Sequence, residues 1–216
     1  MPFEQPNALQ IHVALDGIEP AVWRRLAVPC SWHLGELHLA IQAAFNWWNY
    51  HLHEFGIGGL RYGDPDTVDW SGVGDPRVFD ERTVRLLDFD REPGLAFTYL
   101  YDFGDSWLHT VTIEGPLVVG ARPHHATCLD GARARPPEDV GGIRGYERFL
   151  AIMADPGNPE HAETRRWCGG HFAPEWFDRA LVGKDLRSAL KPTTRAASPS
   201  PPAVSPRRSP APLSGC

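Results

Sequence analysis

Alternating apolar residues make positions 97–113 the most regular stretch of the chain. Every second position is aromatic or apolar along two short runs, and the runs flank the turn residues Gly104, Asp105 and Ser106. A period of two is typical of a strand with one buried face, and two such runs joined by a turn predict a β-hairpin. The residues expected on its buried face are Phe97, Tyr99, Tyr101, Phe103, Trp107, His109, Val111 and Ile113.

Two further strands are predicted near the start of the chain. Apolar residues alternate with polar ones over residues 9–15, and a second alternating run extends from Pro20 to Pro29. Because proline has no N–H to donate, the second strand is expected at or near an edge of the sheet. Its Trp23-Arg24-Arg25 segment could contact nucleic acid, but basic residues on an edge strand usually serve solubility, and we favour that interpretation.

Helical periodicity appears first between Leu34 and Trp47 and predicts an amphipathic helix that packs on the sheet. It returns at Tyr146–Met153, between Pro159 and Trp167, and from Pro174 to Leu190. The strands are concentrated early in the chain and the helices late. The pattern therefore predicts an α+β fold with a mostly antiparallel sheet rather than a parallel βαβ repeat.

Two internal stretches, residues 61–82 and 120–145, are rich in Gly, Asp and Pro and are expected to be long surface loops. Residues 191–216 consist largely of Pro, Ser, Ala and Arg and contain too few bulky apolar residues to offset the entropy of folding. We therefore expect a single domain over residues 1–190, followed by a disordered tail.

The composition is that of a globular protein, because 42% of the 216 residues are hydrophobic and 11% are aromatic. The net charge is -6, but four of the 21 basic residues and none of the 27 acidic ones lie in the tail, which leaves residues 1–190 with a charge of -10. An acidic body repels a phosphate backbone, so non-specific nucleic-acid binding is not expected.

The four cysteines are widely scattered and form no C-x-x-C pair, and the N-terminal residues do not have the pattern of a secretory leader. Reduced thiols and a cytoplasmic location are therefore expected. No apolar run approaches the roughly 20 residues needed to span a bilayer, so no membrane partner is expected.

Several motifs occur in a fixed order: EPAVWRRLAVP, ELHLAIQAAFNWWNYHLHEF, RYGDPD, YDFGDSWLH, PPEDVGG with GYERFL, and GGHFAPEWFD. In this order they resemble the Ri-plasmid open-reading-frame-three-like family, whose members are often labelled transposon passenger protein TnpR. The resemblance covers about residues 8–190. It implies a plasmid- and mobile-element-associated α+β domain whose molecular activity is not established.

The chain departs from the pattern of this family at two places. Many relatives have extra cysteines where this chain has Arg135 and Val140, which leaves Cys128 alone, so a four-cysteine zinc site is not available. Relatives also tend to have Asp where Ala173 stands, so the last helix is expected to lack a side-chain N-cap.

The TnpR label does not carry the activity of a serine resolvase to this chain. Such an enzyme needs a nucleophilic serine early in an α/β domain and a basic helix-turn-helix. No serine precedes Ser31, and acidic residues are mixed with the arginines of the C-terminal helices.

The candidate chemistry lies in histidines and carboxylates near the hairpin. His51 and His53 share one face if their segment is extended, and together with His109, Asp102 and Asp105 they are residue types that bind transition metals. The alternative is that all three histidines are hydrogen-bonded core or rim residues. We favour this structural interpretation and assign no metal and no cofactor.

The leading hypothesis is a non-catalytic binding or accessory module for an unknown protein or small ligand. Its recognition cleft is expected where the hairpin rim, the HLHEF segment and the PPED loop meet, if that loop folds over the hairpin. The candidate binding residues are His51, His53, Asp102, Asp105, Trp107, His109, Glu138 and Asp139. The alternative is a metal-dependent hydrolase or nuclease-like enzyme that uses the three histidines with Asp102 or Asp105.

Overall fold

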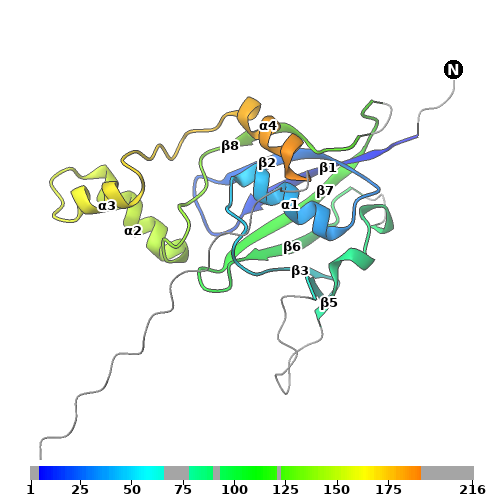
Figure 1. Ribbon diagram of the computed structural model, residues 1–216, viewed down its shortest axis with the longest axis horizontal. Coiled ribbons are helices and arrows are strands. Elements are labelled where there is room, and N and C mark those ends of the chain that lie inside the picture. Colours follow the sequence, from blue (N-terminus) through cyan, green and yellow to red (C-terminus); the bar gives the residue numbers. More distant parts are fainter. Residues whose placement is uncertain (1–4, 66–77, 90–92, 121–122, 191–216) are drawn as a thin grey trace, which may run out of the picture.

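A computed structural model of the chain describes residues 5–65, 78–89, 93–120 and 123–190 (Figure 1). An eight-stranded sheet forms one layer, and two helices that contact each other, α1 (Leu34–Phe45) and α4 (Arg179–Ala189), cover one of its faces. The predicted α+β class with a mostly antiparallel sheet is confirmed. The predicted tail, residues 191–216, lies outside the described residues.

The strands are β1 (Ala8–Leu15), β2 (Val22–Pro29), β3 (His53–Ile57), β4 (Leu60–Gly63), β5 (Val78–Asp80), β6 (Ala96–Tyr101), β7 (Trp107–Leu117) and β8 (Thr127–Ala132). The remaining elements are the helices α2 (Gly142–Ala154) and α3 (His161–Trp167) and the 3-10 turns η1 (Glu81–Thr83) and η2 (Leu86–Asp88). In the described ranges, no helix has the length and apolar character that a membrane crossing requires.

The strand order is β5-β4-β3-β6-β7-β1-β2-β8, which places the β6–β7 hairpin at the centre of the sheet. Each neighbouring pair is antiparallel except β4 and β5, which are parallel. As predicted, β2 lies next to an edge. The edge itself is β8, which pairs with β2 from a stretch that the sequence pattern assigned to a loop.

The hairpin register sets Tyr99 opposite His109 and Tyr101 opposite Trp107, so the heaviest side chains of the two strands share one face. All four are fully buried. Phe103, which the alternation assigned to the same face, is 46% exposed. The alternation stops because β6 ends at residue 101 and the next residue adopts a positive φ of 58°, which turns the chain away before residue 103.

Helix α1 buries its apolar stripe against this aromatic face, as its three- and four-residue periodicity predicts. Its first turn is closed by a reciprocal cap, in which Glu36 N–H donates to His33 Nδ1 and His33 N–H donates to Glu36 Oε2. Asn46 ends the helix in the left-handed conformation, with φ at 62°. The side chains that the stripe contributes to the core include Leu34, Leu37, Ile41, Ala44 and Phe45.

Both stretches that the sequence pattern assigned to loops contain strands. Residues 61–82 include most of β4 and all of β5, with residues 66–77 outside the described part, and residues 120–145 include β8. These strands are short and lack a regular apolar alternation. They are held by pairing with a neighbouring strand, which is a tertiary effect that local periodicity does not report.

Arg24, which we interpreted as a solubility residue of β2, is only 4% exposed. Its Nε donates to Ala44 O at 2.9 Å, and its Nη2 donates to Arg133 O at 2.9 Å. Burial lowers the pKa of this guanidinium to about 10. Arg24 therefore ties β2 to the end of α1 and to the chain after β8, and it is not available to contact nucleic acid.

The last helix begins later than its periodicity suggested. It starts at Arg179 rather than near Pro174, and the Asp178 carboxylate accepts hydrogen bonds from Ala180 N–H at 2.8 Å and Leu181 N–H at 3.0 Å. The expectation that this helix lacks a side-chain N-cap is therefore wrong. The helix starts after position 178, where an aspartate is present, and not at position 173.

Because neighbouring residues of β7 point to opposite faces of the hairpin, replacing them with alanine should destabilise the protein to different extents. Trp107 is fully buried, and Trp107→Ala should lower the free energy of unfolding by about 3 to 5 kcal/mol, because a large cavity opens in the core. Leu108 points to the other face, and Leu108→Ala should cost less than about 1 kcal/mol. Urea unfolding of both variants measures the difference, and similar costs would show that the facing is wrong.

Candidate functional site

The PPEDVGG loop, residues 136–142, packs on the turn of the β6–β7 hairpin. Gly141 N–H donates to Asp105 Oδ2 at 3.0 Å. Gly142 has φ at 66°, and a Cβ atom at this position would lie 2.7 Å from Asp105 O. Only glycine permits both this conformation and this close approach, so the second glycine of the motif allows the loop to reach the hairpin.

This packing forms a cluster of one imidazole and three carboxylates, made by His51, Asp102, Glu138 and Asp139, which we call the carboxylate cluster. His51 Nε2 lies 3.2 Å from Asp139 Oδ1, 3.4 Å from Asp102 Oδ2 and 4.0 Å from Glu138 Oε2. The histidine precedes β3, Asp102 is in the hairpin turn, and the other two carboxylates belong to the loop.

The carboxylates differ in their exposure to solvent. The side chain of Glu138 is 2% exposed, whereas that of Asp139 is 62% exposed, so the cluster opens to solvent on the Asp139 side. Glu138 Oε1 accepts a hydrogen bond from Trp48 N–H at 2.7 Å. Its other oxygen, Oε2, is buried and has no hydrogen-bond partner among the described residues. Burial of this side chain is the main reason that the pKa of Glu138 is raised.

The cluster has two chemical possibilities. A protonated His51 can form ion pairs with the surrounding carboxylates, or the ring nitrogen and the carboxylate oxygens can together hold a cation. One donor atom each from His51, Asp102 and Asp139 lies within 4.8 Å of the other two. Imidazole and carboxylate are donors that first-row divalent metals accept.

The other sequence-predicted site residues lie elsewhere, apart from Asp105, which stays beside the cluster through its bond to the loop. Trp107 and His109 are fully buried in the core. His109 Nδ1–H donates to Trp107 O at 3.0 Å, and burial lowers the pKa of its imidazole to about 4, so the ring is neutral at pH 7. We leave both residues out of the candidate site.

His53 takes part in a different polar group from His51. Its Nε2 lies 2.8 Å from Glu81 Oε2, and its ring stacks on His38 with the ring centres 3.5 Å apart. Both partners are buried. The structure therefore separates the two histidines that an extended strand was expected to aim in one direction.

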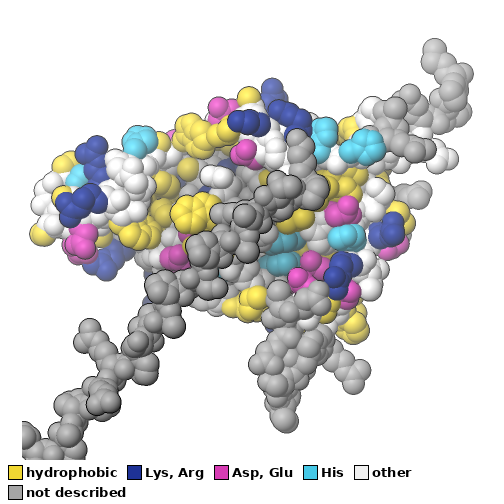
Figure 2. All heavy atoms as spheres, viewed as in Figure 1, with side chains coloured by type: hydrophobic (Ala, Val, Ile, Leu, Met, Phe, Trp, Pro, Cys, Tyr) yellow, Lys and Arg dark blue, Asp and Glu magenta, His cyan; other side chains and the backbone are white. Residues whose placement is uncertain are grey.

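A groove of about 890 Å³ opens beside the carboxylate cluster, between the end of α1, the PPEDVGG loop and the segment from α3 to α4. Hydrophobic side chains are visible where the α2–α3 part of the chain meets the rest of the molecule (Figure 2). Trp48 is 66% exposed and Trp176 is 52% exposed. The aromatic side chains that line the groove include Phe45, Trp48, Trp167, Phe172, Trp176 and Phe177.

The charges at the groove are unbalanced. Arg24 donates its N–H groups to main-chain carbonyls, and Arg135 does the same, with bonds of 3.0 Å and 2.8 Å to Asn46 O. The Arg135 guanidinium also lies over the Trp47 ring, 4.8 Å from its centre. Both guanidiniums keep their positive charge, but the four carboxylates of the lining residues, Glu138, Asp139, Asp178 and Asp185, outnumber these two arginines along the groove.

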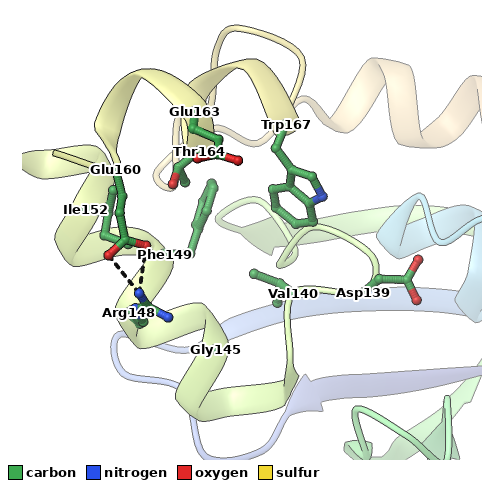
Figure 3. Close-up of a pocket in the computed structure, with 10 residues that line it drawn as sticks. All are labelled: Asp139, Val140, Gly145, Arg148, Phe149, Ile152, Glu160, Glu163, Thr164 and Trp167. Atoms are coloured by element: carbon green, nitrogen blue, oxygen red, sulfur yellow. Dashed lines mark hydrogen bonds and ion pairs between the residues drawn. The ribbon is translucent and has the colours of Figure 1, made fainter. Parts of the chain in front are cut away.

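A second, smaller pocket of about 400 Å³ lies between α2 and α3 (Figure 3). Arg148 Nη2 and Glu160 Oε2 form an ion pair there, 2.7 Å apart, and the Phe149 and Trp167 rings meet edge to face. Asp139 also lines this pocket, but its carboxylate is directed away from the hollow (Figure 3). The Arg148 and Glu160 side chains of this pocket are therefore paired with each other.

Sequence reasoning did not identify the groove. It also did not identify Tyr50, which contacts the carboxylate cluster. Tyr50 O–H donates to Asp139 Oδ2 at 2.6 Å, and Trp48 and Trp176 rim the groove. The available signal was the position of these aromatic residues. Trp48 and Tyr50 follow α1 and Trp176 precedes α4, so none of them belongs to a helical apolar stripe.

Comparison with known proteins gives consistent matches. Residues 7–181 match the family model described as plasmid pRiA4b ORF-3-like protein. The uncharacterized protein y4hQ of Sinorhizobium fredii (strain NBRC 101917 / NGR234) is 41% identical over 173 residues, which are 76% of this chain and 81% of that protein. The crystal structure of a protein of unknown function, MM3350 from Methanosarcina mazei Go1, matches 80% of this chain and 96% of its own at a TM-score of 0.67 and 34% identity.

The raised pKa of Glu138 predicts a pH-dependent effect of Glu138→Gln. Ionisation of Glu138 costs more in the folded state than in the unfolded state, so the wild type loses stability as the pH rises above about 4.5 toward the raised value. The glutamine does not titrate and can still accept the Trp48 hydrogen bond. The stability of the variant relative to wild type should therefore increase between about pH 4 and about pH 7.

Urea unfolding at both pH values, with a chelator present, measures this difference. Glu147 is exposed on α2, and Glu147→Gln provides the matched control for the loss of a surface carboxylate. A difference for Glu138→Gln that stays constant or falls with rising pH would contradict the burial of this carboxylate.

Proposed function

The chain belongs to the plasmid pRiA4b ORF-3-like protein family, and we propose that it is a non-catalytic binding module whose ligand occupies the groove beside the PPEDVGG loop. The volume of about 890 Å³ is within the range of sites that enclose a short peptide segment or a small organic molecule. The proposal rests on one observation above all, which is that this groove combines exposed tryptophans with more carboxylates than guanidinium groups.

The aromatic lining supports a role in binding. Tryptophan side chains supply large contact areas at little cost in conformational entropy, and they are enriched among the residues that dominate binding energy. Trp48 and Trp176 are both more than half exposed, although the fold buries most of its other large rings. Contact with a ligand would remove their apolar surface from water.

The charges define the chemical class of the ligand. Arg24 and Arg135 direct several of their N–H groups to main-chain carbonyls, which leaves fewer donors for an anionic ligand. Asp139 and Asp185 carry negative charge at the groove, and tryptophan faces attract cations. The ligand that fits best is an apolar segment of a partner protein that carries lysine or arginine side chains.

A metal-dependent enzyme remains the second candidate function, and the carboxylate cluster is the observation that favours it. The sequence suggested three histidines for this site, but His53 and His109 are not part of the cluster because both are hydrogen-bonded elsewhere. The cluster retains His51 with three carboxylates, which are groups that can bind a metal and accept a proton.

Selection of random peptides of about ten residues on phage tests the proposed function. Enriched sequences should combine aromatic or aliphatic residues with lysine or arginine. The affinity of a selected synthetic peptide, measured by fluorescence anisotropy, should fall about tenfold or more for Trp176→Ala, because an aromatic anchor is lost. Trp176 is half exposed, so the variant should fold.

Phe79→Ala is the matched control, since Phe79 is an exposed aromatic residue on β5, at the far edge of the sheet from α4. It should leave peptide affinity unchanged. The proposal fails if no basic, apolar peptides are enriched. It also fails if the selected peptides bind wild type, Trp176→Ala and Trp48→Ala equally well.

A further inference from the structure

We propose that His51, Asp102 and Asp139 bind a divalent first-row transition-metal ion, with Glu138 as the fourth protein group at this site. The proposal concerns the carboxylate cluster and does not depend on a ligand in the groove. It also revises the expectation from the sequence, which assigned no metal. The sequence grouped His51 with His53 and His109, and the proposed site retains only His51 of these three.

The distances from His51 Nε2 to the two aspartates match those of a metal coordination shell. With metal–ligand bonds of about 2.0 to 2.1 Å, neighbouring ligand atoms of a tetrahedral site are about 3.3 Å apart. His51 Nε2 lies 3.2 Å from Asp139 Oδ1 and 3.4 Å from Asp102 Oδ2. All three donor atoms lie within 4.8 Å of one another, so modest side-chain rotations would surround one ion.

Each carboxylate also has one oxygen fixed by the protein and the other directed to His51. Asp102 Oδ1 accepts from Gly104 N–H at 2.9 Å, Asp139 Oδ2 accepts from Tyr50 O–H at 2.6 Å, and Glu138 Oε1 accepts from Trp48 N–H at 2.7 Å. The oxygens Asp102 Oδ2, Asp139 Oδ1 and Glu138 Oε2 remain near the ring nitrogen. Hydrogen bonds of this kind orient the ligands of metal sites.

Glu138 provides an independent indication that the cluster is incomplete without a ligand. Its side chain is 98% buried, and its Oε2 has no hydrogen-bond partner among the described residues. This atom is directed into the cluster, 4.0 Å from His51 Nε2, and the latter is likewise buried without a hydrogen-bond partner in the described part of the chain. A metal ion, or a water molecule bound to it, would satisfy both atoms.

The charge of the cluster also favours a dication. Three carboxylates surround one imidazole, and Arg135 is the cation whose charge acts on Glu138 most strongly. A divalent ion together with Arg135 offsets three negative charges, whereas a protonated His51 contributes only one positive charge. The mixed nitrogen and oxygen donors favour zinc, manganese or iron over magnesium and calcium, which prefer oxygen ligands alone.

Isothermal titration of ZnCl₂ and MnCl₂ into the full-length chain, purified without a histidine tag and stripped with EDTA, tests this site. At least one of the two metals should bind in equimolar amount and raise the melting temperature by about 5 °C, because it binds only the folded state. His51→Gln and Asp139→Asn should each weaken binding about tenfold or more. Asp139 is exposed, so its variant should fold normally without metal.

His125 and Asp130 provide the matched controls, because both are exposed residues of the chain around β8, away from the cluster. His125→Gln and Asp130→Asn should bind the metal as wild type does. The metal site is excluded if neither ion binds below millimolar concentration, which would leave ion pairs of His51 as the role of the cluster. It is equally excluded if both cluster variants bind as wild type does, or if His125→Gln weakens binding as much as His51→Gln.

Discussion

The aromatic face of the β6–β7 hairpin has to be removed from water, and the rest of the fold is arranged around this constraint. The hairpin is central in the sheet, and α1 covers its buried face. The hydroxyl of Tyr99, deep in this layer, is satisfied by α1, since Gln42 Nε2 donates to it at 2.8 Å and His38 Nδ1 lies 2.8 Å away. Apolar burial provides the driving force, and these two hydrogen bonds fix the position of the helix.

The same hairpin determines where the candidate site lies. Its turn ends the buried face, because Asp102 leaves the strand conformation with a positive φ and its carboxylate accepts from Gly104 N–H. The turn offers Asp105 as an acceptor to the PPEDVGG loop, and Gly142 allows the loop to approach closely. Glu138 and Asp139 are thereby carried next to His51. The site therefore forms where the hairpin turn and the PPEDVGG loop meet at the rim of the core.

The sequence predicted those parts of the molecule that have a strong internal period. The hairpin, β1, α1 and the α+β class follow from apolar alternation or helical spacing, and the family resemblance was confirmed by the match over residues 7–181. The short strands β4, β5 and β8 were missed because partner strands hold them. For the site, the spacing of His51 and His53 suggested one direction for both rings. Glu81, which has no local relation to either histidine, draws His53 away.

The cost of the carboxylate cluster to the fold is an argument that the cluster serves a function. A buried acceptor without a partner destabilises a protein by about 1 to 3 kcal/mol, and more when it is charged, while the whole domain is stable by only about 5 to 15 kcal/mol. Glu138 carries this cost although its contact with Trp48 N–H requires only one of its two oxygens. A glutamine could make the same contact without the charge. A carboxylate at this position is therefore better explained by a cation that binds beside it than by the requirements of folding.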